Sequence, residues 1–354
     1  MTQLMGICYH SGMNILLTSA GRRTYLVRYF KEAMDSGSLL YASNSELSPA
    51  LCEADHAVIS PLIYSEDYIP FLLELCRKHD IKLIVPLFDV DVWKLSTKRE
   101  LFISEGIVPA VSSMETIRLC NDKKLMAEKL SSLSIDSPVC ALNIREYEGE
   151  YPVYIKPRFG MGSIGLYRAA SEREAEVLYD MCLERIRNSY LSFETEEKLG
   201  TEGEADSAVL LQEEIRGSEY GLDIINDFNG RYKTTVVRKK LAMRSGETDE
   251  ALVLCGDTEE ERILSELGRR ISEGFGHIGN MDVDIILDDR DKRPYVLDMN
   301  VRFGGGYPFS HAAGIDLPGA YICWAEGREA PEELLTVKRS VHAYKDIDIR
   351  IYDR

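Results

Sequence analysis

Short apolar runs alternate with amphipathic segments along the first ninety residues of the chain. Between the runs, two segments have apolar positions at helical spacing, at residues 24–34 and 67–79. The alternation predicts a doubly wound α/β fold with a parallel sheet. The runs that have the length and composition of buried strands lie at residues 14–18, 39–42, 57–59 and 83–87.

Polar side chains follow the first and the fourth of these predicted strands. Because ligands of such sheets lie beyond the carboxyl ends of the strands, we expect a binding site there. The first loop has too few glycines for the dinucleotide fingerprint, which argues against NAD. The two arginines could hold a substrate carboxylate or phosphate, or they could be solvated residues of the first helical turn. The residues in question are Ser19, Gly21, Arg22, Arg23, Asp89 and Asp91.

The pattern changes after residue 120. Asn121 and Asp122 are typical of a cap for a helix over residues 123–133. We expect the polar and acidic residues 188–207 to form an exposed loop. Strands and helices are predicted in the rest of this part at residues 152–156, 166–169, 172–186, 209–212, 220–225 and 259–275, with a hairpin after the last helix.

A glycine loop lies between two of these strands, with the sequence Lys156-Pro157-Arg158-Phe159-Gly160-Met161-Gly162-Ser163-Ile164-Gly165. In a dinucleotide fold the third glycine would open a helix, whereas here it precedes a short alternating strand. The loop is therefore predicted to be the tip of a β-hairpin, a flap whose backbone N–H groups can close over phosphates. Lys156 would supply positive charge for those phosphates. The alternative is a glycine-rich surface hairpin without a ligand.

Acidic residues interrupt two apolar strands that flank the turn at residues 288–294. Alternation places Asp282 and Asp284 on one face of the first strand, and Asp298 and Asn300 on one face of the second. A symmetric hairpin would set Asp284 opposite Asp298, and such facing carboxylates need a cation. These hard oxygen ligands suit Mg²⁺ shared with phosphates, and the nearby Arg302 could stabilise a transferring phosphoryl group. The alternative is a solvated acidic face neutralised by the basic residues of the turn.

Composition narrows the classes of protein that remain. The 354 residues are 45% hydrophobic and 29% charged, with no apolar run long enough for a membrane span, so we expect a soluble globular protein. The net charge of -17 argues against nucleic acid and anionic membranes as partners. None of the eight cysteines lies in a C-x-x-C pair, which favours reduced thiols in the cytoplasm. Residues 1–12 are predicted to be a disordered lead.

Together these motifs, in this order, resemble the ATP-grasp superfamily, and within it the branch similar to the large subunit of carbamoyl-phosphate synthase. The resemblance runs from about Asn14 to about Gly327. It implies an N-terminal pre-ATP-grasp α/β domain at residues 13–120 and a two-subdomain ATP-grasp domain at residues 121–335. The central lobe of that domain would span about residues 140–215, and residues 336–354 would be a C-terminal extension.

The resemblance also implies which residues bind ATP. The helix start Asn121-Asp122-Lys123-Lys124 and the strand Tyr154-Ile155-Lys156-Pro157, similar to the family's "v-x-K-P" strand, would each place a lysine on the phosphates. The segment at residues 211–220 looks like the family's hinge, whose backbone meets adenine at Glu213 and Ile215 and whose Glu219 holds the ribose. The implied ATP-binding residues are Lys123, Lys156, Gly160, Gly162, Ser163, Gly165, Glu213, Ile215 and Glu219.

The segment at residues 296–302 resembles the family's "v-i-E-x-N-x-R" motif. It implies Mg²⁺ (or Mn²⁺) on Asp284, Asp298 and Asn300, with Arg302 and Lys156 as catalytic residues. Asp298 stands where the family usually has Glu, which shortens the metal ligand, and Val301 replaces a common proline. Residues 304–311 resemble the substrate-side loop of small ligases. The candidate substrate residues are Arg22, Arg23, Asp89, Gly305, Tyr307 and His311.

We therefore expect an ATP-dependent ligase that forms an acyl phosphate from a small-molecule carboxylate and passes it to an amine or thiol, releasing ADP and phosphate. Two alternatives stay open: a carbamoyl-phosphate-synthase-like or carboxylating enzyme that uses bicarbonate, and a non-catalytic nucleotide-binding regulator. A homodimer also stays open. His311 is a candidate base for the amine or a structural residue. The basic run Arg238, Lys239, Lys240 and Arg244 faces phosphate or substrate, or is a solvated strand edge.

Overall fold

Five parallel strands form the first sheet of the protein. The computed structural model describes residues 12–160, 164–199, 207–244 and 246–351. The sheet has the order β3-β2-β1-β4-β5 and every pair in it is parallel, which confirms the predicted doubly wound α/β fold. Its strands are β1 (Asn14–Thr18), β2 (Leu40–Asn44), β3 (His56–Ile59), β4 (Ile81–Pro86) and β5 (Val108–Pro109), and its helices are α1 (Thr24–Ala33), α2 (Tyr68–Lys78), α3 (Asp89–Thr97), α4 (Arg99–Ser104) and α5 (Met114–Asn121).

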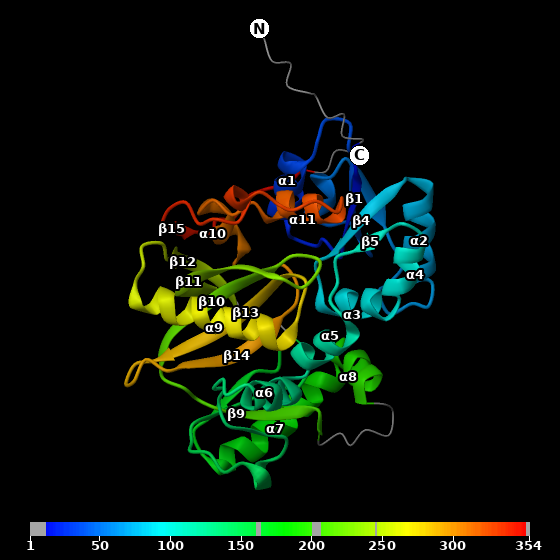
Figure 1. The fold of residues 1–354 in the computed structure, drawn as a ribbon. Helices are drawn as coiled ribbons and strands as arrows, with labels where there is room; N and C mark the ends of the chain where they lie inside the picture. Colours follow the sequence, from blue (N-terminus) through cyan, green and yellow to red (C-terminus); the bar gives the residue numbers. More distant parts are fainter. Residues whose placement is uncertain (1–11, 161–163, 200–206, 245, 352–354) are drawn as a thin grey trace.

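A small antiparallel sheet of order β6-β9-β7-β8 forms the central lobe, at the bottom of Figure 1. Because β7 and β8 pair antiparallel, the glycine loop between them is the tip of a hairpin, as predicted. Apolar side chains of α7 cover one face of the sheet. The elements of this lobe are β6 (Cys140–Ala141), β7 (Val153–Pro157), β8 (Tyr167–Ala169), β9 (Val209–Glu213), α7 (Glu172–Arg187) and α8 (Leu191–Leu199).

Helix α8 contradicts the expectation of an exposed loop over residues 188–207. Leu191 and Glu194 are buried, and Phe193 stacks on Tyr64 with ring centroids 4.9 Å apart. Glu194 and Lys198 pair at i,i+4, which supports a helix in a polar sequence. Leu191 packs in the core of the central lobe, whereas Phe193 packs on a residue of the N-terminal part of the chain, which the local sequence does not reveal.

Six strands of order β14-β13-β10-β11-β12-β15 form the last sheet. Helix α9 lies across one face of it (Figure 1), at the predicted position. Strand β11 pairs with β10 as far as Lys239 and with β12 as far as Arg244, so the strand-edge interpretation is wrong for Arg238 and Lys239, whereas Lys240 and Arg244 have a neighbouring strand on one side only. The elements are β10 (Gly217–Asn226), β11 (Tyr232–Arg244), β12 (Glu247–Val253), β13 (Gly279–Asp288), β14 (Pro294–Asn300), β15 (Val341–Tyr344), α6 (Lys123–Ser132), α9 (Glu259–Phe275), α10 (Tyr307–Ala312) and α11 (Leu317–Ala325).

The apolar cores show which parts of the chain are packed together. One core joins the parallel sheet to the C-terminal part of the chain, since Leu17 and Phe30 share it with Phe303 and Tyr321. The central lobe has a core of its own, built by β7, β8, β9 and α7. The first and last parts of the chain are therefore one packed body, and the central lobe is attached to it. None of the helices in the described ranges has the length and apolarity needed to cross a membrane.

Candidate active site

The acidic hairpin of β13 and β14 has the register that alternation predicts. Asp282 lies opposite Asn300 and Asp284 opposite Asp298. Burial raises the pKa of Asp298, but the positive charges of Lys123 and Lys156 outweigh it, and the net result is a lowered pKa. Asp298 is therefore ionised at neutral pH. Asp284 is more exposed and pairs with Lys240 at 2.6 Å.

Two lysines from separate elements meet this hairpin. Lys123, in the first turn of α6, donates to the Gly160 carbonyl oxygen at 2.8 Å and lies 3.5 Å from an Asp298 oxygen. Burial, and then repulsion from Lys123, lowers the pKa of Lys156 to about 8. Two ammonium groups that repel one another beside ionised carboxylates are suited to hold a ligand with several negative charges.

The cap of α6 also fixes the start of the glycine loop. Asp122 accepts from the backbone N–H groups of Lys124 and Leu125, as predicted for an N-cap. The same carboxylate pairs with Arg158 in a two-pronged contact of 2.8 and 2.7 Å. Gly160 lies two residues after Arg158. The glycine loop therefore starts beside a residue that is paired with the cap of α6.

The glycines of the loop meet different surroundings. Gly160 has a φ of +99° and Gly165 a φ of +73°, a backbone region that favours glycine. A methyl group on Gly160 would overlap Leu191 of α8, whereas one on Gly165 would touch Pro157 more loosely. Gly162 and Ser163 lie outside the described residues, so their predicted phosphate contacts stay predictions.

The predicted hinge lies where the chain crosses between the central lobe and the last sheet. The N–H of Glu213 donates to the Val139 carbonyl at 2.9 Å, and its carboxylate accepts from the Val139 N–H at 3.2 Å. The two crossing segments are thus joined side by side. Ile215 is buried and Glu219 is exposed at the start of β10. Their adenine and ribose contacts stay predictions.

Arg302 reaches across to the N-terminal sheet. Its side chain is 8% exposed, and its Nε donates to Asp89 Oδ2 at 3.0 Å. Asp89 is the first residue of α3, directly beyond the carboxyl end of β4. The predicted catalytic arginine and a predicted substrate residue are therefore partners of one another. The neighbouring Asp91 is fully buried and accepts from Tyr68 Oη at 2.8 Å, so it serves the core.

The two adjacent arginines after β1 differ in their surroundings. Arg22 is exposed. The pKa of Arg23 is lowered by burial, and the charges of Arg302, Asp89 and Glu247 also act on it. Arg23 is therefore near enough to the Arg302–Asp89 pair for their charges to act on it, and it is a better candidate for a substrate carboxylate than the exposed Arg22.

The loop after β14 is shaped by close contacts. A methyl group on Gly304 would overlap the Asp282 carboxylate, and one on Gly306 would overlap the Arg238 guanidinium. Gly305 is more open, since a methyl group there would lie 3.7 Å from Lys345 Nζ. Both tight glycines therefore let the backbone pass close to charged groups of the site.

Tyr307 is a correction to the predicted substrate residues. Its side chain is fully buried, and its hydroxyl donates to the Ile315 carbonyl at 3.1 Å and accepts from the Leu317 N–H at 3.0 Å. It holds the turn between α10 and α11 and does not line the site. His311 stacks on Tyr29 with centroids 3.6 Å apart, and burial lowers the pKa of its imidazole. These contacts favour the structural interpretation of His311.

Sequence comparison agrees with the motifs. The family described as "PylC-like, N-terminal domain" matches residues 15–110, and the family described as "ATP-grasp in the biosynthetic pathway with Ter operon" matches residues 205–347. The chain belongs to the ATP-grasp superfamily. The second match includes the hinge and the whole acidic hairpin.

Solved structures share the fold of this ATP-grasp chain. Biotin carboxylase from Campylobacter jejuni, in complex with an ATP analogue, has a TM-score of 0.71 at 18% identity, over 92% of this chain and 73% of that chain. The biotin carboxylase domain dimer of Hydrogenobacter thermophilus 2-oxoglutarate carboxylase, with MgADP and bicarbonate, has 0.70 at 17%, over 91% and 71%. L-amino acid ligase from Bacillus licheniformis has 0.65 at 17%, over 88% and 74%.

The ATP-grasp site contains residues that sequence analysis missed. Glu194 and Lys198 of α8, with Asn121, line a cavity of about 10 Å³ together with Lys123, Asp298 and Asn300. That is about the room one water molecule needs. Arg238 was predicted only as part of a basic run, yet it is buried and pairs with Asp223 and Asp282. The only local signal for α8 was the spacing of Glu194 and Lys198.

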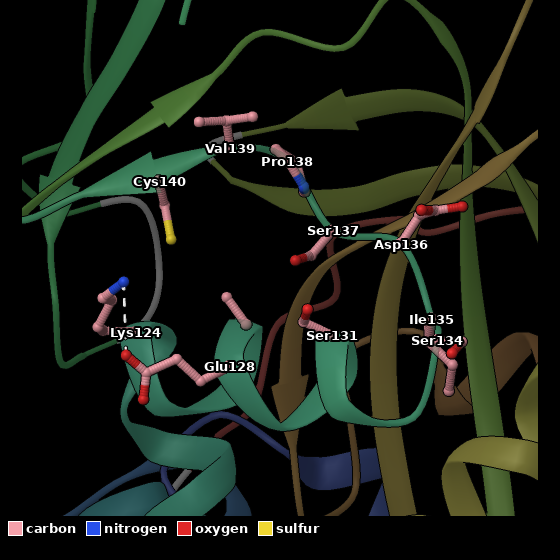
Figure 2. A pocket seen from close by; sticks show the side chains of 11 residues that line it. Lys124, Glu128, Ser131, Ser134, Ile135, Asp136, Ser137, Pro138, Val139 and Cys140 are labelled. Carbon is pink, nitrogen blue, oxygen red and sulfur yellow. Dashed lines mark ion pairs between the residues drawn. The ribbon is translucent and has the colours of Figure 1, made fainter. Parts of the chain in front are cut away.

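A larger hollow of about 650 Å³ lies elsewhere on the ATP-grasp chain (Figure 2). It is bounded by the side of α6 that carries Lys124, Glu128 and Ser131, and by residues 134–140. Lys124 and Glu128 form an ion pair of 3.4 Å across one end of it. None of the predicted site residues lines this hollow, so size alone does not locate the chemistry.

Proposed function

We propose that the chain is an ATP-dependent ligase that converts a carboxylate substrate to an acyl phosphate and transfers the acyl group to an amine or thiol, releasing ADP and phosphate. One observation carries the proposal. Three kinds of group come together at one place from separated segments of the chain. They are lysines from two elements, the oxygen ligands of the hairpin, and an arginine that a carboxylate of the N-terminal part holds. Such a set positions and neutralises a triphosphate, which is most of what phosphoryl transfer requires.

ATP would lie between the central lobe and the last sheet. Lys123, Lys156 and the glycine loop at residues 160–165 would hold the phosphates. The backbone at Glu213 and Ile215 would meet adenine, and Glu219 would hold the ribose. The closeness of Lys123 to both the loop and Asp298 supports this arrangement, since one ammonium can then contact the phosphates from beneath the flap.

The donor set of the hairpin fits a hard divalent cation. Asp284, Asp298 and Asn300 would hold Mg²⁺ or Mn²⁺, with phosphate oxygens completing the shell. Within the described residues no group of three His, Cys, Asp or Glu side chains forms a ready cage, which agrees with a metal that arrives with the nucleotide. Without nucleotide, lysines neutralise both aspartates. With nucleotide bound, these lysines would pair with the phosphates instead. When bound, the cation supplies charge neutralisation for the phosphates.

The remaining groups orient the acid. Arg23 would bind the substrate carboxylate, one oxygen of which attacks the terminal phosphorus while the bond to ADP breaks. Arg302 would stabilise the charge on the transferring phosphoryl group, and Asp89 would hold its guanidinium in place. A cytoplasmic location is part of the proposal, because the cysteines in the described ranges are all free thiols.

The second candidate function is a carboxylating reaction through carboxyphosphate. Its support is the fold shared with biotin carboxylases, one of which was solved with bicarbonate. The two functions differ in what releases ADP. Two reactions with Mg-ATP should be compared. One contains amino acids as the acid and hydroxylamine to trap an acyl phosphate, and the other contains bicarbonate alone. A hydroxamate formed with ADP and phosphate supports the ligase; ADP release with bicarbonate alone supports the carboxylating enzyme, and AMP with pyrophosphate contradicts both.

Arg302→Ala provides the structural check on this assay. We expect hydroxamate formation to fall about 10²-fold or more, the scale for loss of one preorganised donor to a transition state. Arg22→Ala is the matched control, because this arginine after β1 is exposed. Equal rates in the two variants would remove Arg302 from the mechanism.

A further inference from the structure

Helix α8 bridges the N-terminal sheet and the glycine loop. Glu197 accepts from Trp93 Nε1 at 3.2 Å and from Lys94 Nζ at 2.9 Å, both on α3. At the other side, the ammonium of Lys198 lies over the rings of Trp93 and Phe159, 5.1 Å from each centroid. The helix is thus held at the point where the phosphates and the acid substrate would meet.

Glu194 of this helix is buried with one oxygen unused. Its side chain is 3% exposed, and one oxygen pairs with Lys198 at 3.1 Å. Within the described part of the chain the other oxygen, Oε2, has no hydrogen-bond partner. It lines the small cavity that Lys123, Asp298 and Asn300 also line. A buried carboxylate oxygen without a partner is costly, and a ligand that donates to it would remove that cost.

The charges around this oxygen select the kind of ligand. Lys198 and Lys123 set positive charge against Glu194, while Asp89 and Asp298 add negative charge at the same cavity. A thiolate or an ionised carboxylate has no N–H or O–H group to donate to the free oxygen, and bicarbonate has only one. An ammonium group carries three N–H donors and a positive charge, so it satisfies the free oxygen and relieves the repulsion at once.

We propose that Glu194 binds the acceptor substrate of the ligase as a primary ammonium, and that the acceptor is therefore an amine. The inference rests on the proposed ligase function and narrows it, since it names an amine, in place of a thiol or bicarbonate, as the second substrate. Glu194 comes from a segment whose sequence resembles no motif of the site. Contacts with α3, with the glycine loop and with the core of the central lobe hold α8, and with it Glu194, at the cavity.

The proposed step balances in protons and charge. Glu194 takes one proton from the ammonium, and the freed amine attacks the carbonyl carbon of the acyl phosphate. A C–N bond forms, the C–O bond to the phosphate breaks, and the second proton leaves with the phosphate as hydrogen phosphate. The products are the amide, hydrogen phosphate and a neutral Glu194, which returns its proton to solvent.

The test compares two nucleophiles in Glu194→Gln. Hydroxylamine is mostly uncharged at neutral pH and needs no base, whereas an amino acid offers an ammonium. The substrates tested are pairs of the twenty amino acids, each pair supplied together with Mg-ATP. We expect Glu194→Gln to lose about 10- to 100-fold in kcat/KM for the amine, with part of the loss in KM, and to lose much less in hydroxamate formation than in use of the amine. Glu194→Asp should restore part of it. Glu196→Gln, an exposed neighbour on α8, should behave as wild type.

The outcomes separate the inference from the function it rests on. If Glu194→Gln and Glu196→Gln use the amine equally well, the inference is overturned while the ligase stands. If wild type forms no hydroxamate and no ADP with any pair, the ligase proposal fails. The inference is then decided by thermal unfolding with methylammonium chloride against sodium chloride: methylammonium should stabilise wild type and not Glu194→Gln. No stabilisation of wild type would overturn the inference. The same unfolding curves show whether each variant folds.

Discussion

At the scale of single residues, Asp298 is the point on which most charges of the site act. It lies opposite Asp284 and beside Lys123, and two lysines lower its pKa. Asp298→Ala should reduce Mg-ATP affinity about 10- to 100-fold, because a charged ligand of this kind is worth about 1.5–3 kcal/mol. Calorimetric titration measures this. Asp291→Ala, in the exposed turn of the same hairpin, is the control, and equal affinities would mean that the acidic face binds no metal.

Loss of the same carboxylate should also lower the stability of the ligand-free protein. Asp284 already has Lys240, whereas without Asp298 the repulsion between the ammonium groups of Lys123 and Lys156 would lose the carboxylate that offsets it most. Thermal unfolding of Asp298→Ala without nucleotide checks this second effect. An unchanged unfolding temperature would show that solvent screens the two lysines.

Lys156 gives the site a dependence on pH. Burial, and then Lys123, lowers its pKa from 10.5 to about 8. Between these values the unfolded chain binds more protons at this residue than the folded chain, so the stability of the ligand-free protein should rise with pH across that window. ATP affinity should change in the opposite direction, because the ammonium is lost above about pH 8. Lys156→Met should remove both trends and be at least as stable as wild type at neutral pH. Titrations and unfolding curves over this range test both signs, and a stability that falls with pH in wild type alone would contradict them.

At the scale of elements, the glycine loop depends on α8. Gly160→Ala and Gly165→Ala both place a side chain at positive φ, which costs about 1–2 kcal/mol in either case. Only the first also drives a methyl group into Leu191. We therefore expect Gly160→Ala to lose more ATP affinity and more thermal stability than Gly165→Ala. Equal losses in the two variants would mean that α8 gives way without cost.

How far the sequence predicts an element depends on whether its cause is local. The register of the acidic hairpin was predictable because strand alternation and the turn lie within twenty residues. The position of α9 was predictable from its amphipathic pattern. Helix α8 was not, because Trp93 and Lys94 that hold it are about a hundred residues away. The pairing of Arg302 with Asp89 joins positions 213 apart, and no local pattern marks it.

At the scale of the whole molecule, the division of the cores predicts where the protein moves. The parallel sheet and the last sheet share one core, whereas the central lobe has its own. The lobe is joined to the rest by the two crossing segments at Val139 and Glu213, by α8, and by the polar contacts of Asp122 and Lys123 with the glycine loop. Opening the lobe would break few apolar contacts, so nucleotide could enter by that motion.

Glu197 tests this division because it makes the hydrogen bonds of α8 with α3. Glu197→Ala removes a hydrogen bond from Trp93 and a half-exposed ion pair with Lys94, together about 1–2 kcal/mol. The amides of α8 should then exchange hydrogen about 5–30-fold faster. The unfolding temperature should hardly change, because neither core is touched. A nonhydrolysable ATP analogue with Mg²⁺ should slow the exchange again, since bound phosphates tie the glycine loop to Lys123. Glu196→Ala is the control, and equal exchange in the two variants would mean that α8 is held by the central lobe alone.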